Sequence, residues 1–186
     1  INNPDAPKKE PYPYAWGGLN DPRVYNCEDN IRLTPLIRNT YIRLANTLTA
    51  EGEIEKAEAV LDRGNVVLPN QTIPYVSTYK SDYALWCLNY VQQYFKLRTP
   101  SGEEKGMGMI KDMLQSFKEN FEWYEKQSNR TITIHSDNII SDFYVIGQIL
   151  NQLNSKQIKK IQNELKAIRI NSTADIAINT LDKRLS

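Results

Sequence analysis

Residues 34–69 read TPLIRNTYIRLANTLTAEGEIEKAEAVLDRGNVVLP, and this stretch decides the fold. Apolar side chains recur at helical spacing over 37–48 and again over 54–68, which places them on one face of each segment. Gly52 interrupts the pattern between the two segments, and Pro69 ends the second one. The stretch therefore predicts two antiparallel helices joined by a tight turn.

The order of large and small residues in this hairpin matches the tetratricopeptide pattern. The matching positions are Tyr41, Leu44, Ala45 and Leu48 in the first helix, then Ala57, Leu61 and Pro69 in and after the second. Small residues let two antiparallel helices approach closely, and Gly64 supplies a further small contact. A generic helical hairpin with coincidental spacing is the alternative interpretation. No second copy with this spacing follows, so we expect the later helices to complete the core as atypical caps.

Helical patterns continue through most of the remaining chain. We expect helices over 77–97, 103–126, 139–153, 155–168 and 178–185. Capping signals precede several helices: Thr34 with Pro35, Ser101 with Glu104, Ser155, and Ser172 with Asp175. Only the Thr-Ile-Thr-Ile alternation within 130–135 suggests an extended segment, and a single strand has no partner. The predicted fold class is all-α, with about seven helices in antiparallel pairs that form a short tetratricopeptide-like solenoid with atypical C-terminal helices.

The composition is that of a globular protein. The 186 residues are 40% apolar and 24% charged, and the formal net charge is +1. This charge balance creates no overall field for nucleic acid, so we expect no nucleic-acid partner. The longest apolar runs are far shorter than the roughly 18 to 20 residues that cross a bilayer, so we expect a soluble piece.

The start of the chain has a different character. Residues 1–15 are rich in asparagine, proline and charge, which is typical of a linker, and Ile1 is preceded by neither a methionine nor a signal pattern. We therefore expect a fragment of a longer protein. Its predicted parts are a linker over 1–15, a tetratricopeptide-like domain over 16–128, and C-terminal helices over 129–186 that pack on this domain.

The first half of the chain also resembles a known family. The residues that carry the resemblance are Trp16 to Tyr25, Glu28, Arg32, Arg38, Asn39, Leu44, Ala45, Glu51, Gly52, Lys56, Ala57, Val60 to Asp62, Leu68, Pro69, Pro74 and Tyr75. Over residues 14–76 the chain is similar to the C-terminal soluble region of a bacterial multi-pass membrane family of unknown function, which is related to protein O-mannosyltransferases. The resemblance implies a membrane-embedded, glycosyltransferase-like parent that uses lipid-linked sugar and keeps its catalytic acids in the membrane part. It also implies an extracytoplasmic, periplasmic location for this region.

The residue patterns match no catalytic, metal or cofactor site. His135 is the only histidine, so a catalytic triad would have to use it, and no GxSxG nucleophile elbow accompanies it. One histidine with two distant cysteines also makes a poor zinc site. Cys87 lies in an apolar stretch typical of a buried thiol, and its spacing from Cys27 fits no CxxC motif, although a disulfide between the two stays open. Adjacent acids such as Glu103 and Glu104 are typical of a solvated helix face. We expect this region to hold no catalytic residue, no metal and no cofactor.

The best candidate for a binding site is a polar stripe on the first predicted helix. Asn39, Arg43 and Asn46 fall on one face, and the first helix of each pair lines the concave surface of such arrays. Asparagine can donate to and accept from an extended peptide backbone, and arginine can bind a carboxylate. Simple solvent exposure of the three side chains is the alternative interpretation.

Aromatic residues near the start of the chain allow a second hypothesis. Trp16 and Tyr25 either pin the incoming segment onto the first helix pair or stack on a sugar. The sequence therefore favours a non-catalytic scaffold that binds a protein or peptide partner. It leaves open a carbohydrate-binding module with a glycan partner, and a structural cap of the membrane part.

Overall fold

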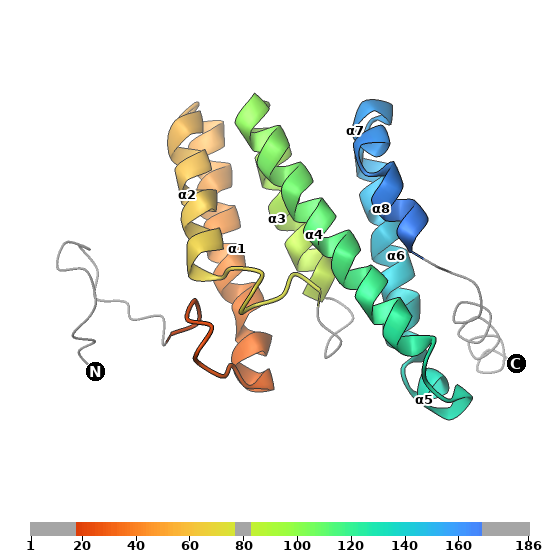
Figure 1. Ribbon diagram of the computed structural model, residues 1–186. Coiled ribbons are helices and arrows are strands. Elements are labelled where there is room, and N and C mark those ends of the chain that lie inside the picture. The colour runs from red at the N-terminus through yellow and green to blue at the C-terminus, as the bar shows by residue number, and fades with distance from the viewer. Residues whose placement is uncertain (1–17, 77–82, 169–186) are drawn as a thin grey trace, which may run out of the picture.

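The computed structural model describes residues 18–76 and 83–168, and within these ranges the chain forms eight helices and no strand (Figure 1). The helices are α1 (Glu28–Ala50), α2 (Ile54–Val67), α3 (Tyr83–Lys96), α4 (Pro100–Tyr124), α5 (Asn129–Ile134), α6 (Ser136–Gln152), α7 (Ser155–Lys160) and α8 (Gln162–Ala167). The predicted all-α fold class is therefore confirmed. In the described part of the chain, no helix combines the length and the hydropathy that crossing a membrane requires.

The helices lie in two layers. In the view of Figure 1, α2, α4 and α8 lie in front of α1, α3 and α6. Helix α1 packs on α2 and α3, α3 packs on α4 and α6, and α4 packs on α6 and α8. The α1–α2 pair, the α3–α4 pair and the α6–α8 segment therefore stand side by side, and the short α5 connects α4 to α6 at one end.

Small residues let α1, α2 and α3 approach one another closely, as the hairpin pattern predicts. Ala57 and Leu61 of α2 are fully buried. A Cβ on Gly64 would lie 2.1 Å from the Tyr90 hydroxyl oxygen and 3.0 Å from the Tyr41 ring, so only glycine fits there. The Tyr90 hydroxyl donates a hydrogen bond to the Leu61 carbonyl, which joins α3 to α2 at the same point.

A buried arginine joins α1 to the segment that follows α2. Arg38 is 1% exposed, and its Nη2 donates to the carbonyls of Leu68 at 2.8 Å and of Ile73 at 3.2 Å. The guanidinium carbon lies 5.0 Å from the centroid of the Tyr75 ring, whose electron-rich face attracts a cation. Within the described ranges Arg38 forms no ion pair, so backbone carbonyls and an aromatic ring stabilise its charge.

Both cysteines are free thiols. Cys27 is exposed, whereas Cys87 is fully buried. Burial raises the pKa of the Cys87 thiol, against the opposing effect of the nearby Arg38 guanidinium, so the thiol stays protonated. The prediction of a buried Cys87 is confirmed, and no disulfide joins the two cysteines.

Charged side chains join α2 to α4. Lys105 Nζ lies 2.6 Å from Glu58 Oε1 and 2.7 Å from Asp62 Oδ2. The Tyr94 hydroxyl donates to the second oxygen of Asp62 at 2.9 Å, and Ser101 Oγ donates to Glu58. The hydrogen bond from Lys105 lowers the pKa of Glu58, so the carboxylate stays ionised. These contacts fix the α1–α2 pair against the α3–α4 pair.

The start of α1 differs from the expected one. The helix begins at Glu28, so Pro35 lies inside it and Thr34 is not its N-cap. Proline lacks the N–H that would bond to the carbonyl of Ile31, and the Thr34 hydroxyl donates to that carbonyl instead at 2.7 Å. The same hydroxyl lies 2.7 Å from the hydroxyl of Tyr83 on α3. These bonds let the helix continue through the proline.

Two further capping predictions are wrong by one or two residues. Thr99 rather than Ser101 caps α4, because the Thr99 hydroxyl accepts a backbone N–H of the first turn while Ser101 bonds to Glu58 on α2. Asn154 rather than Ser155 caps α7, in a capping box. An asparagine side chain reaches the same N–H groups as a serine hydroxyl does.

The extended segment predicted within 130–135 is helical. It belongs to α5, where Ser128 Oγ accepts the Thr131 N–H at 3.3 Å and Ile132 is buried. A capped turn satisfies backbone groups that an isolated strand would leave unpaired. The predicted linker over 1–15 and the predicted helix over 178–185 lie outside the described residues.

Candidate functional site

The predicted polar stripe lies on α1, at the edge that adjoins α3. Arg43 and Asn46 are exposed, and Asn39 is half-buried. Asn46 Oδ1 accepts a hydrogen bond from Lys96 Nζ of α3 at 3.4 Å. The stripe is therefore continuous with the exposed side of the next helix in the same layer.

The C-terminal turn of α3 continues this surface toward α6. Lys96 Nζ also donates to Gln93 Oε1 at 3.4 Å. Beyond Lys96 lies a hollow of about 370 Å³ whose lining residues come from α3, the turn after it and the end of α6. They are Gln92, Phe95, Lys96, Arg98 and Gln152. Lys96 thus belongs both to the contact with α1 and to the hollow beside α6.

Two residues that line this hollow have unusual local environments. Gln152 Oε1 is buried and accepts no hydrogen bond within the described residues. A buried acceptor without a donor costs free energy, on the order of 1 to 3 kcal/mol. Arg98 has a φ of +56°, in the left-handed region that favours glycine, and its exposed side chain forms no ion pair in the described chain. Strained residues of this kind cluster at binding sites.

We call the surface formed by these residues the inner face. It comprises Asn39, Arg43, Asn46, Gln92, Lys96, Arg98 and Gln152. Three of these side chains are cationic, the other four are amides, and none is a carboxylate. Amides can pair with both the N–H and the C=O groups of an extended peptide, and the cations can bind carboxylates.

The inner face was only partly visible in the sequence. The α1 stripe was predicted, whereas Lys96, Arg98 and Gln152 were not. Asn89, Gln92 and Lys96 recur at helical spacing in a mostly apolar segment, and they are the signal that one side of α3 faces solvent. No sequence signal places Gln152 beside Arg98, because α3 and α6 meet only in the tertiary structure.

The single histidine packs against aromatic side chains. His135 lies between α5 and α6, and its ring centroid is 5.8 Å from that of Trp123 and 5.9 Å from that of Tyr124. In the described ranges, no group of three or more His, Cys, Asp or Glu side chains could hold a metal ion. Glu103 lies 3.0 Å from Lys160 in an ion pair between α4 and α7.

The sequence patterns did not indicate the buried carboxyl group of Asp142 in α6. Asp142 is 7% exposed, and Asn120 Nδ2 of α4 donates to its Oδ2 at 3.2 Å. Burial raises the pKa of Asp142 to about 7. The group lies in the contact between α4 and α6 and lines none of the hollows named above. It therefore bears on stability and on its pH dependence.

Of the two aromatic residues in the sugar hypothesis, the structure describes only Tyr25, which is 87% exposed. The prediction that it pins the incoming segment onto the first helix pair is therefore wrong. Tyr25 lines a shallow hollow of about 560 Å³ with neighbours from 22–26 and from the segment after α2. Trp16 lies outside the described residues.

Comparisons of this chain with protein-family models, with curated protein sequences and with solved structures gave no match.

Proposed function

We propose that this region is a non-catalytic scaffold whose inner face binds an extended segment of a partner protein. The observation that carries the proposal is the 3.4 Å contact between Asn46 and Lys96. It extends the polar stripe of α1 to the hollow that Gln92, Lys96 and Gln152 line. A surface of amides and cations that extends across α1, α3 and the end of α6 suits a peptide better than it suits an apolar small molecule.

The proposal includes a tetratricopeptide-like origin for the α1–α2 pair. The close approach at Ala57 and Gly64, together with the side-by-side order of the pairs, supports it. Arrays of helix pairs bind partners on the surface lined by the first helix of each pair. In this chain those helices are α1, α3 and α6.

The resemblance over 14–76 leads us to propose a cellular setting as well. In this setting the region belongs to a membrane-embedded, glycosyltransferase-like protein, lies on the extracytoplasmic face of a bacterial membrane, and brings a partner to that protein. Catalysis is then the task of the membrane part.

Affinity capture with a matched pair of variants tests the proposed function. The Arg43→Ala, Asn46→Ala double variant should lose a partner that the wild-type chain captures. The control is Lys56→Ala, which removes one cation from α2, where the side chain is exposed and pairs only with nearby Glu53. The partner should then be purified, and its affinity should fall by about tenfold or more in the double variant alone. Equal binding to all three proteins would refute the proposal.

A carbohydrate-binding module is the second candidate, because the Tyr25 ring is almost fully exposed beside a hollow. Aromatic faces of this kind can stack on sugars. A glycan array with wild type, Trp16→Ala and Tyr25→Ala tests it, and binding that either substitution abolishes would favour this module. If capture and array are both negative, and deletion only lowers the amount of the parent protein, the region is a structural cap.

A further inference from the structure

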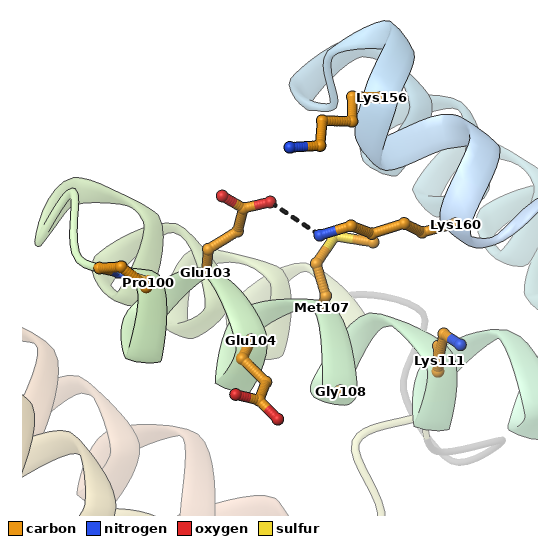
Figure 2. A pocket seen from close by; sticks show the side chains of 8 residues that line it. All are labelled: Pro100, Glu103, Glu104, Met107, Gly108, Lys111, Lys156 and Lys160. Atoms are coloured by element: carbon orange, nitrogen blue, oxygen red, sulfur yellow. Dashed lines mark hydrogen bonds and ion pairs between the residues drawn. The ribbon is translucent and has the colours of Figure 1, made fainter.

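Another hollow lies between α4 and α7, across the α3–α4 turn from the hollow of the inner face (Figure 2). Its volume is about 520 Å³, and its lining residues are Pro100, Glu103, Glu104, Met107, Gly108, Lys111, Lys156 and Lys160. The ion pair between Lys160 and Glu103, at 3.0 Å, crosses it. Figure 2 shows the Lys156 side chain extending from α7 over the same space.

A smaller hollow connects this space to the inner face. It measures about 270 Å³ and is lined by Phe95, Arg98, Thr99, Pro100, Glu103 and Gln157. It shares Phe95 and Arg98 with the hollow of the inner face, and Pro100 and Glu103 with the hollow between α4 and α7. These three hollows are therefore neighbours along the α3–α4 turn, and we call the surface that they form together the trough.

The floor of the trough is partly apolar. The Phe95 ring lies directly against α4, because a Cβ on Gly106 would lie only 2.6 Å from its Cε1. Met107, one residue further on, lines the hollow with Pro100. A ligand that fills the trough would therefore cover apolar side chains as well as charges.

The rim of the trough carries an excess of positive charge. Its cations are Lys96, Arg98, Lys111, Lys156 and Lys160, and its carboxylates are Glu103 and Glu104. Lys160 pairs with Glu103, and Lys111 pairs with Glu164 at 3.1 Å. Arg98, on the α3–α4 turn, and Lys156, on α7, form no ion pair in the part of the chain that the structure describes. Cations spaced along a groove attract an extended anion.

We propose that the trough binds an acidic, partly apolar peptide segment of the partner in an extended conformation. Carboxylates of the segment pair with Arg98 and Lys156, and its apolar side chains cover Phe95 and Pro100. The segment thus passes from the inner face over the α3–α4 turn to the space between α4 and α7. This inference rests on the proposed function, because it names the chemistry of the partner segment.

Fluorescence anisotropy with three labelled peptides of equal length tests the inference on the full chain. One peptide alternates glutamate with leucine, the second carries glutamine in place of glutamate, and the third carries lysine. The glutamate peptide should bind most tightly, and its affinity should fall with added salt. The combined Arg98→Gly, Lys156→Gln variant should weaken binding of that peptide by about tenfold.

Two further variants distinguish binding at the trough from a general attraction by the net charge of the chain. Lys159→Gln removes a charge from the same helix at a residue that does not line the trough, and it should change the affinity little. Glu103→Gln removes a repelling carboxylate and frees Lys160, so it should tighten binding of the glutamate peptide severalfold. Glycine at position 98 accepts the left-handed conformation, so loss of binding in that variant would not reflect a damaged turn.

The outcomes keep the two proposals apart. Equal binding of the glutamate and glutamine peptides would overturn the trough proposal. An equal loss for Lys159→Gln and for the combined Arg98→Gly, Lys156→Gln variant would overturn it as well. If the glutamine peptide then still loses affinity with Arg43→Ala and Asn46→Ala, the inner face stands without the trough. A single-stranded RNA that competes as strongly as the glutamate peptide would also overturn the inference. If no peptide binds and no partner is captured, the proposed function fails with it.

Discussion

Substituting Gly64 by alanine tests the closest contact in the fold. The added Cβ would lie 2.1 Å from the Tyr90 hydroxyl oxygen and 3.0 Å from Cγ of Tyr41. Both are far inside the ordinary contact distance of about 3.5 to 4.0 Å. Tyr90 is fully buried, so its ring has no open space to enter. We therefore expect overpacking, together with loss of the hydrogen bond from Tyr90 to the Leu61 carbonyl.

The expected magnitude follows from three contributions. Overpacking typically costs about 1 to 3 kcal/mol, and losing the hydrogen bond costs about 1 kcal/mol. The better helix propensity of alanine offsets about 1 kcal/mol. The free energy of unfolding of Gly64→Ala should therefore fall by about 1 to 3 kcal/mol.

Gly147→Ala in α6 is the matched control. A Cβ at Gly147 has no neighbouring atom within 4 Å, so only the gain in helix propensity remains. This variant should be more stable than wild type by about 0.5 to 1 kcal/mol. Urea unfolding followed by circular dichroism measures both variants against wild type. Adding Tyr90→Phe to Gly64→Ala should restore part of the loss, because it removes the hydroxyl that clashes.

The reasoning would be refuted if Gly64→Ala were as stable as Gly147→Ala. That result would mean that α1, α2 and α3 do not meet at Gly64. The tetratricopeptide-like packing would then lose its main support.

The remaining predictions also concern stability. Burial raises the pKa of Asp142 from its ordinary value of 3.8 to about 7, so between these values the folded state holds a proton that the unfolded chain has released. This group therefore lowers the stability as pH rises from about 4 to about 7 and has a constant effect above that range. Asp142→Asn should remove this loss. The difference in the free energy of unfolding between Asp142→Asn and wild type, measured in urea, should therefore grow in favour of the variant by roughly a few kcal/mol across that pH range. A difference that does not depend on pH would contradict the assignment. Arg98→Gly should raise the unfolding free energy by up to about 1 kcal/mol, because glycine relieves the left-handed backbone at φ +56°, and a loss of stability would count against that strain. Ala57→Leu should cost about 1 to 3 kcal/mol through overpacking of a fully buried site, and an unchanged melting temperature would contradict the close approach of α1 and α2.

The first helix pair was predictable because its signals are local. Apolar spacing, the small residues and the Gly52 turn all act within one hairpin, and Gly52 has the positive φ of +82° that such a turn requires. The buried Cys87 was predictable for the same reason, since its immediate neighbours in the chain are apolar.

The helix starts were less predictable because capping residues have competing partners. Thr34 looks like an N-cap in sequence, but its hydroxyl serves the carbonyl that Pro35 leaves without a donor and also contacts Tyr83. Ser101 looks like a cap for α4, but its hydroxyl donates a hydrogen bond to Glu58 of α2 instead. Both choices depend on side chains that are distant in sequence.

The candidate site likewise has one part with local sequence signals and one part that depends on tertiary packing. The stripe of Asn39, Arg43 and Asn46 could be seen as a helix face, whereas the contribution of α3 and α6 depends on how pairs stack. Arg98 carries a weak local signal, because it follows a helix end where glycine is common. Gln152 carries none, since its importance comes from an acceptor that is buried only in the folded chain.

Site-specific photocrosslinking with this chain tests the inner face most directly. A photoreactive amino acid replaces Asn46 in one version and Lys56 in the other, and both positions are exposed, on α1 and α2 respectively. The account predicts a discrete crosslinked partner from position 46, none from position 56, and loss of the product when Arg43→Ala is added. Crosslinking of the same partner from both positions, or from neither, would contradict binding at the inner face.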